Sequence, residues 1–129
     1  MGLRYAAVHM LIHFLFPFTV LYFFGMSLLQ FIIVLASAVI IDLDHLSLVK
    51  RYGIRGTFRK VVLKGFGKVR RYPLHNFAIL TVSVLSAFVF LYEGFFIGGM
   101  FSLAIFFHLI WDLLEDVVIF KVGIDHWKV

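Results

Sequence analysis

Residues 27–45 read SLLQFIIVLASAVIIDLDH, an apolar run that ends in two carboxylates and an imidazole. Asp42, Asp44 and His45 form a dense polar cluster for a sequence this apolar. At about 1.5 Å per residue, the run over residues 27–43 is nearly long enough to cross the roughly 30 Å hydrocarbon core of a bilayer. The stretch therefore predicts a membrane-spanning helix with a polar site at its carboxyl end.

The rest of the chain has the same apolar character. Of its 129 residues, 63% are hydrophobic and 15% are charged, and the mean hydropathy is +1.03. A soluble domain of this size could not bury so much apolar surface, so we expect the bilayer to solvate most of it. The length predicts a single domain over residues 1–129. The chain has no cysteine, so any metal must be held by imidazole and carboxylate rather than by thiolate.

Four apolar runs are predicted to be transmembrane helices, because only helices satisfy their backbone polar groups in lipid at this length. The runs cover about residues 5–24, 27–43, 74–92 and 95–120. Gly25 separates the first two runs and Glu93-Gly94 separates the last two, so each pair is expected to form a hairpin. The predicted fold is all-α and integral to the membrane, with four transmembrane helices in two hairpins.

The basic residues predict the orientation of these helices. Most of the twelve cations lie between the second and third runs, in residues 46–72, and the others lie near the two termini. Under the positive-inside rule, this segment and both termini are expected on the cytoplasmic side of an inner or plasma membrane. Because topology already accounts for the basic segment, nucleic acid is not an expected partner.

Within the basic segment, apolar residues recur at helical spacing. These positions are Phe58, Val61, Val62, Phe66 and Val69. The pattern predicts a basic amphipathic helix that lies at the membrane surface and binds anionic lipid head groups. Gly65 and Gly67 weaken this helix, so it can be broken. A solvated loop whose charges only orient the protein is a compatible alternative.

With this topology, the ionisable residues of the four runs fall in the cytoplasmic half of the membrane. An acidic side chain near a helix centre costs about 2.5–3.5 kcal/mol on insertion scales, so such residues usually face a partner or a wet cavity. Mixed imidazole and carboxylate ligation predicts one or two divalent transition metals, zinc or manganese. The predicted ligands are His9, His13, Asp42, Asp44, His45, His75, His108 and Asp112.

Each group also has an alternative without a metal. The first-run histidines could be polar contacts between helices, residues 42–45 could be a wet helix end, and His75 could be a helix start. The carboxylates of Asp112, Glu115 and Asp116 could pair with Lys121 or with the basic segment. His126 lies in a terminal tail and is expected to be solvated. The coincidence of the other groups at one depth favours a site.

These motifs resemble those of the predicted membrane-bound metal-dependent hydrolases, the YdjM-like inner-membrane family. Residues 42–45 are similar to the family's Pro-Asp-x-Asp-His, without the proline, and residues 108–112 are similar to its His-x-x-x-Asp. Arg71 and His75 match two positions of its His-Arg-Gly-x-Thr-His segment, with Arg70 where the family has a histidine. Either histidine of the first run matches the family's first-helix histidine.

The resemblance implies a metal-dependent membrane hydrolase. From the position of the ionisable residues, we expect it to cleave a phospholipid-like or other amphiphilic ester at the cytoplasmic leaflet. Glu115 or Asp116 is the candidate general base, and Arg70 and Arg71 are the candidates for orienting a lipid phosphate. Two other functions stay open: a transporter of metal ions or protons, and a non-catalytic scaffold that binds lipid. Four short spans are also compatible with a homodimer.

Overall fold

The computed structural model describes residues 11, 15, 18–19, 22–23, 25–64, 74–119 and 124–128. Over these residues the chain forms helices and no strands, which confirms the all-α prediction for this part of the chain. The first predicted span, residues 5–24, lies largely outside the described residues, as does the end of the basic segment, from residue 65 onward.

Helix α2 spans Leu28–Ile41 and continues into a short 3-10 helix, η1, at Asp42–His45. Ser27 begins the helix with a capping box. Its hydroxyl accepts a hydrogen bond from the backbone of Gln30, whose side chain in turn accepts one from the backbone of Ser27. The helix therefore starts at the serine that precedes the apolar run and places Asp42 at its carboxyl end.

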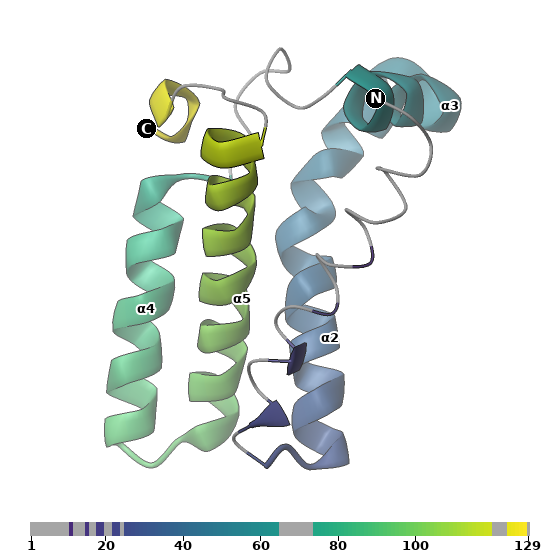
Figure 1. Cartoon of the computed structure of the whole chain (residues 1–129). Coiled ribbons are helices and arrows are strands. Elements are labelled where there is room, and N and C mark those ends of the chain that lie inside the picture. Colours follow the sequence, from purple (N-terminus) through teal and green to yellow (C-terminus); the bar gives the residue numbers. More distant parts are fainter. Residues whose placement is uncertain are drawn as a thin grey trace.

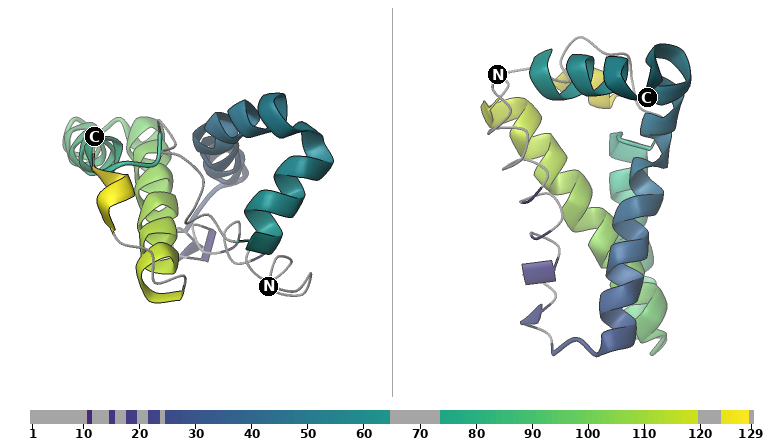
Figure 2. Two further views of the ribbon diagram at one scale, coloured as in Figure 1. Left: turned by 90° about the horizontal axis from the view of Figure 1, so that it is seen from above. Right: turned by 90° about the vertical axis from the view of Figure 1, so that its right-hand side faces the viewer.

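Helix α3 spans Leu46–Lys64 and consists of two helices that meet at Gly53, whose φ of 69° lies in the left-handed region. The segment Leu46–Gly56, which includes this break, turns 82° from the axis of α2. It therefore crosses the end of the helices rather than extending them (Figures 1 and 2). The sequence pattern predicts a helix over residues 58–69, of which residues 58–64 lie in α3 and the later ones lie outside the described residues. The bend at Gly53 is not predicted, because nothing local marks this glycine as the one that bends.

Helices α4, Phe77–Tyr92, and α5, Phe96–Leu114, form a hairpin around Gly94, whose φ is 74°. Asn76 caps α4 by accepting a hydrogen bond from the backbone of Ile79 at 3.0 Å. Helix α5 packs against both α2 and α4 and is the central helix of the three (Figure 1).

Two short helices follow α5. A π-helix, η3, covers Glu115–Ile119 and extends α5, and a 3-10 helix, η4, covers Ile124–Trp127. Single π turns of this kind occur often at functional sites. Both elements lie at the end of the molecule that α3 crosses, opposite the hairpin between α4 and α5 (Figure 1).

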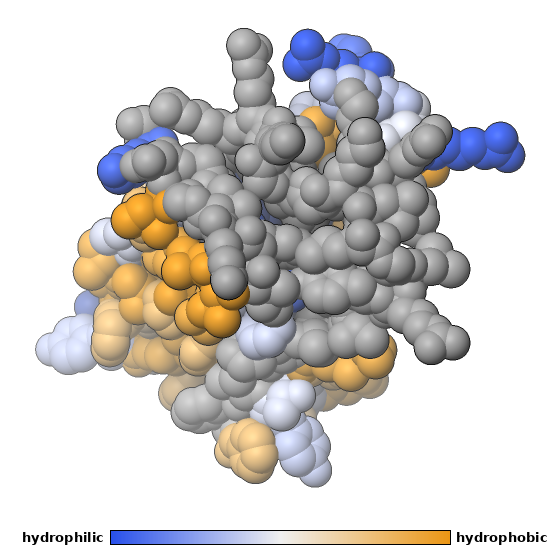
Figure 3. Space-filling view, turned by 45° about the horizontal axis from the view of Figure 1, so that its top comes forward, coloured by the Kyte–Doolittle hydropathy of each residue, from blue (hydrophilic) through white to orange (hydrophobic). Residues whose placement is uncertain are grey.

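Small side chains fill the contacts among α2, α4 and α5, whereas large apolar side chains face outward. The buried small residues are Ser37, Ala38, Ser83, Ala87, Gly99, Ser102 and Ala104. Leu85 and Phe88 on α4, by contrast, are 58% and 70% exposed. Figure 3 shows apolar residues gathered below, with strongly hydrophilic side chains along the upper edge. Small residues inside and large apolar residues outside are typical of helices that pack in lipid.

One described helix, Phe96–Val118, is both long enough and apolar enough to cross a membrane. Helix α2 passes the same test only together with Leu46–Gly56, as a bent pair, and α4 is a shorter apolar helix. The described residues thus contain one candidate span by length and composition.

Candidate metal centre

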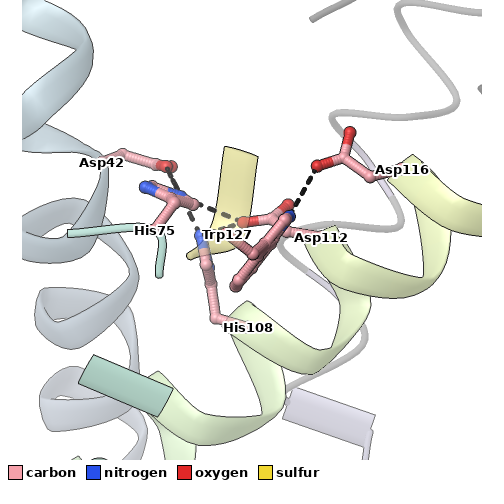
Figure 4. Close-up of polar contacts among 6 residues, drawn as sticks. All are labelled: Asp42, His75, His108, Asp112, Asp116 and Trp127. Atoms are coloured by element: carbon pink, nitrogen blue, oxygen red, sulfur yellow. Dashed lines mark hydrogen bonds and ion pairs between the residues drawn. The ribbon is translucent and has the colours of Figure 1, made fainter. Parts of the chain in front are cut away.

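Four ionisable residues that lie far apart in the sequence meet at one end of the three helices (Figure 4). Asp42 follows α2 directly, His75 lies in the turn before α4, and His108 and Asp112 lie on α5. The two α5 residues share a face because they are four positions apart. We call this group the candidate metal centre.

Each imidazole of the centre faces both carboxylates. The Nε2 atom of His108 lies 3.4 Å from Oδ1 of Asp42 and 3.5 Å from Oδ2 of Asp112. The Nε2 atom of His75 lies 3.0 Å from the same Asp112 oxygen and 3.7 Å from the same Asp42 oxygen. The ligand atoms of Asp42, His75 and His108 all lie within 4.8 Å of one another. These three side chains therefore form a group that could hold a metal ion, and the Asp112 carboxylate lies beside both of its imidazoles.

These distances are compatible with side chains arranged around a cation. A charge-assisted N–H···O bond is about 2.7–2.9 Å long, and three of the four N–O distances are 3.4 Å or more. Two ligands held about 2.05 Å from a tetrahedral zinc lie about 3.3 Å apart, close to the middle of the observed distances.

Burial raises the electrostatic cost of leaving the centre without a cation. The side chain of His108 is 0% exposed, that of His75 is 8% exposed and that of Asp112 is 14% exposed. With neutral imidazoles, the two carboxylates carry two negative charges, that of Asp112 largely shielded from water, which a divalent cation would balance. Asp42 is the most exposed member at 31%, so the centre opens on its side. Catalytic metal sites keep such an open position.

Two further buried residues adjoin the centre. Asp116, one turn beyond Asp112, accepts a hydrogen bond from Nε1 of Trp127 at 3.0 Å. Trp127 is 1% exposed, and its ring lies edge-on to that of His75 with the centroids 6.5 Å apart. Glu115, the other candidate base, is 4% exposed.

Trp127 is the residue of this region that sequence reasoning missed. The sequence predicts that His126, whose side chain the structure does not describe, is solvated in the terminal tail, and it gives no role to Trp127. The signal that could have found it is a large aromatic side chain in an otherwise polar tail. Such a residue usually packs somewhere.

Other predicted site residues are placed only in part or not at all. His9, His13, Arg70 and Arg71 lie outside the described residues. The backbones of Asp44 and His45 lie in η1, but their side chains are not described.

Comparison of the chain with protein-family models, with curated proteins and with solved structures finds no match. The geometry of the centre is therefore what supports a function.

Proposed function

We propose that the protein is an integral membrane hydrolase that holds a divalent transition metal, zinc or manganese, at the candidate metal centre. One observation carries the proposal. Two imidazoles and two carboxylates converge from three parts of the chain, with N–O distances of 3.0–3.7 Å and with one carboxylate partly exposed.

The apolar exterior supports a place in the membrane. Soluble proteins rarely expose contiguous apolar patches of more than a few hundred Å², yet large apolar side chains along α2 and α4 face outward. The proposed topology has four spans, with both termini and residues 46–72 in the cytoplasm. Helix α3 suits the surface of that leaflet, because it turns 82° from α2 and exposes Lys50, Arg51 and Arg55.

The position of the centre supports an amphiphilic substrate. It lies at the end of an apolar set of helices and beside basic α3, where a lipid would place its head group. A bound divalent cation would polarise a phosphoryl or acyl oxygen and acidify a bound water. Arg70 and Arg71 are proposed to orient the head group. Glu115 and Asp116, which are both buried beside the centre, are the two proposed bases.

Hydrolysis by the purified protein tests this function. In mixed micelles of lipid and detergent with zinc or manganese, we expect turnover of a fluorogenic phospholipid, cleaved at a phosphoester or an acyl ester. Chelation should remove the activity, as should Asp42→Asn, which weakens an open-side ligand. Glu93→Gln should keep it, because Glu93 is an exposed carboxylate at the opposite hairpin.

Equal turnover in Asp42→Asn and in the unmodified protein would contradict the role of the centre. Metal or proton flux into sealed vesicles without hydrolysis would favour a transporter instead. Binding to anionic vesicles that survives alanine at both His75 and His108 would favour a scaffold.

A further inference from the structure

The indole of Trp127 links two parts of the chain beside the candidate metal centre. On one side its Nε1 donates a hydrogen bond to Asp116, in the extension of α5. On the other side its ring lies edge-on to His75 and 5.9 Å from the ring of Phe77, the first residue of α4. Figure 4 shows Trp127 between Asp116 and the two histidines. Trp127 thus connects the end of α5 with the turn that begins α4.

The apolar packing around Trp127 reaches every member of the centre through the backbone. Trp127 forms a buried cluster with Ile41 and Leu109, and Leu74 and Leu113 pack against this cluster. Each of the four aliphatic residues is next in sequence to a member of the centre. Ile41 precedes Asp42 and Leu74 precedes His75, whereas Leu109 follows His108 and Leu113 follows Asp112. Displacement of the indole would therefore disturb the packing of residues adjacent to all four ligand residues.

His75 depends most on such support. His108 and Asp112 lie on a regular helix, whereas His75 lies in a turn. Helices α4 and α5 are joined at Gly94, at the opposite end of the molecule (Figure 1), so at the centre only noncovalent packing holds this turn near the end of α5. The contacts of Trp127 are part of that packing.

We infer that Asp116 and Trp127 are positioning residues of the metal centre. Their hydrogen bond holds the indole against His75 and so keeps Nε2 of His75 near the Asp112 carboxylate, at 3.0 Å. The inference rests on the proposed metal centre and gives Asp116 a role in metal affinity rather than in proton transfer.

Cobalt binding by the purified full-length protein tests this role, because the visible absorption of Co²⁺ reports both affinity and ligand geometry. We expect Trp127→Phe and Asp116→Leu to weaken cobalt binding about 10–100-fold, as removal of the partners of metal ligands does, and to change the spectrum. Asp116→Asn should bind cobalt like the unmodified protein, because its amide oxygen can still accept from the indole. Glu93→Gln, which alters an exposed carboxylate at the opposite hairpin, should also bind normally.

The outcomes separate this inference from the proposed function. Unchanged affinity and spectrum in both Trp127→Phe and Asp116→Leu would overturn the inference and leave the metal centre in place. Weak binding by Asp116→Asn would overturn it as well, because the hydrogen bond would then not be what matters. Trp127→Phe keeps a buried aromatic ring but removes the indole N–H. It therefore tests the hydrogen bond to Asp116 even if Asp116→Leu does not fold. No cobalt binding by the unmodified protein would contradict the metal centre itself.

Discussion

Replacing His108 by alanine is expected to abolish the stabilisation of the folded protein by zinc. The buried Nε2 atom of His108 lies 3.4 Å from the Asp42 carboxylate and 3.5 Å from the Asp112 carboxylate, so its loss removes a central ligand. A ligand present at 100 times its Kd raises the free energy of unfolding by about 2.7 kcal/mol. The unmodified protein should show this increase on addition of zinc, and His108→Ala should show none.

Each protein is compared with itself, with and without zinc, so the cost of the cavity left by His108→Ala cancels. Glu93→Gln should keep the full response, since it alters an exposed carboxylate remote from the centre. An equal zinc response in His108→Ala would show that His108 is not a ligand. If the imidazoles are instead protonated and simply paired with the carboxylates, zinc should stabilise neither protein.

Placing arginine at Leu85 is expected to remove much of the protein from the membrane. Leu85 lies in the middle of α4 and is 58% exposed. In hydrocarbon, an arginine at a helix centre costs about 3 kcal/mol, whereas a surface substitution in water usually changes stability by no more than about 0.5 kcal/mol. Leu85→Arg should therefore lower the fraction of protein that stays in membranes after alkaline extraction.

Tyr92→Arg is the matched control on the same helix. Tyr92 is the last residue of α4 and is 90% exposed. It lies about 10 Å from Leu85 along the helix axis, where an arginine can extend to the head groups. The control should stay in the membrane. Equally small effects at both positions would contradict the placement of α4 in hydrocarbon.

Much of the helical architecture could be predicted because local signals agree with the apolar runs. Helices α2, α4 and α5 lie within the predicted ranges 27–43, 74–92 and 95–120. Ser27 and Asn76 are good N-caps directly before apolar residues, and Gly94 supplies the positive φ of the last hairpin.

The candidate site could be anticipated in part for a similar reason. His108 and Asp112 share a helix face by spacing alone, and counting residues from the basic segment places Asp42 and His75 at the same depth. Trp127 and the bend at Gly53 could not be predicted in this way. The burial of Trp127 depends on an apolar cluster built from residues of several helices. The bend depends on which of several glycines adopts a positive φ.

Elemental analysis of the detergent-purified protein tests the central claim most directly. After loading with zinc or manganese and removal of excess metal, we predict close to one bound ion per chain, because Asp42, His75 and His108 form a single group that could hold it. The double variant Asp42→Asn, His108→Ala should retain none. Absence of bound metal in the unmodified protein, even after loading, would contradict the metal centre and the hydrolase proposed from it.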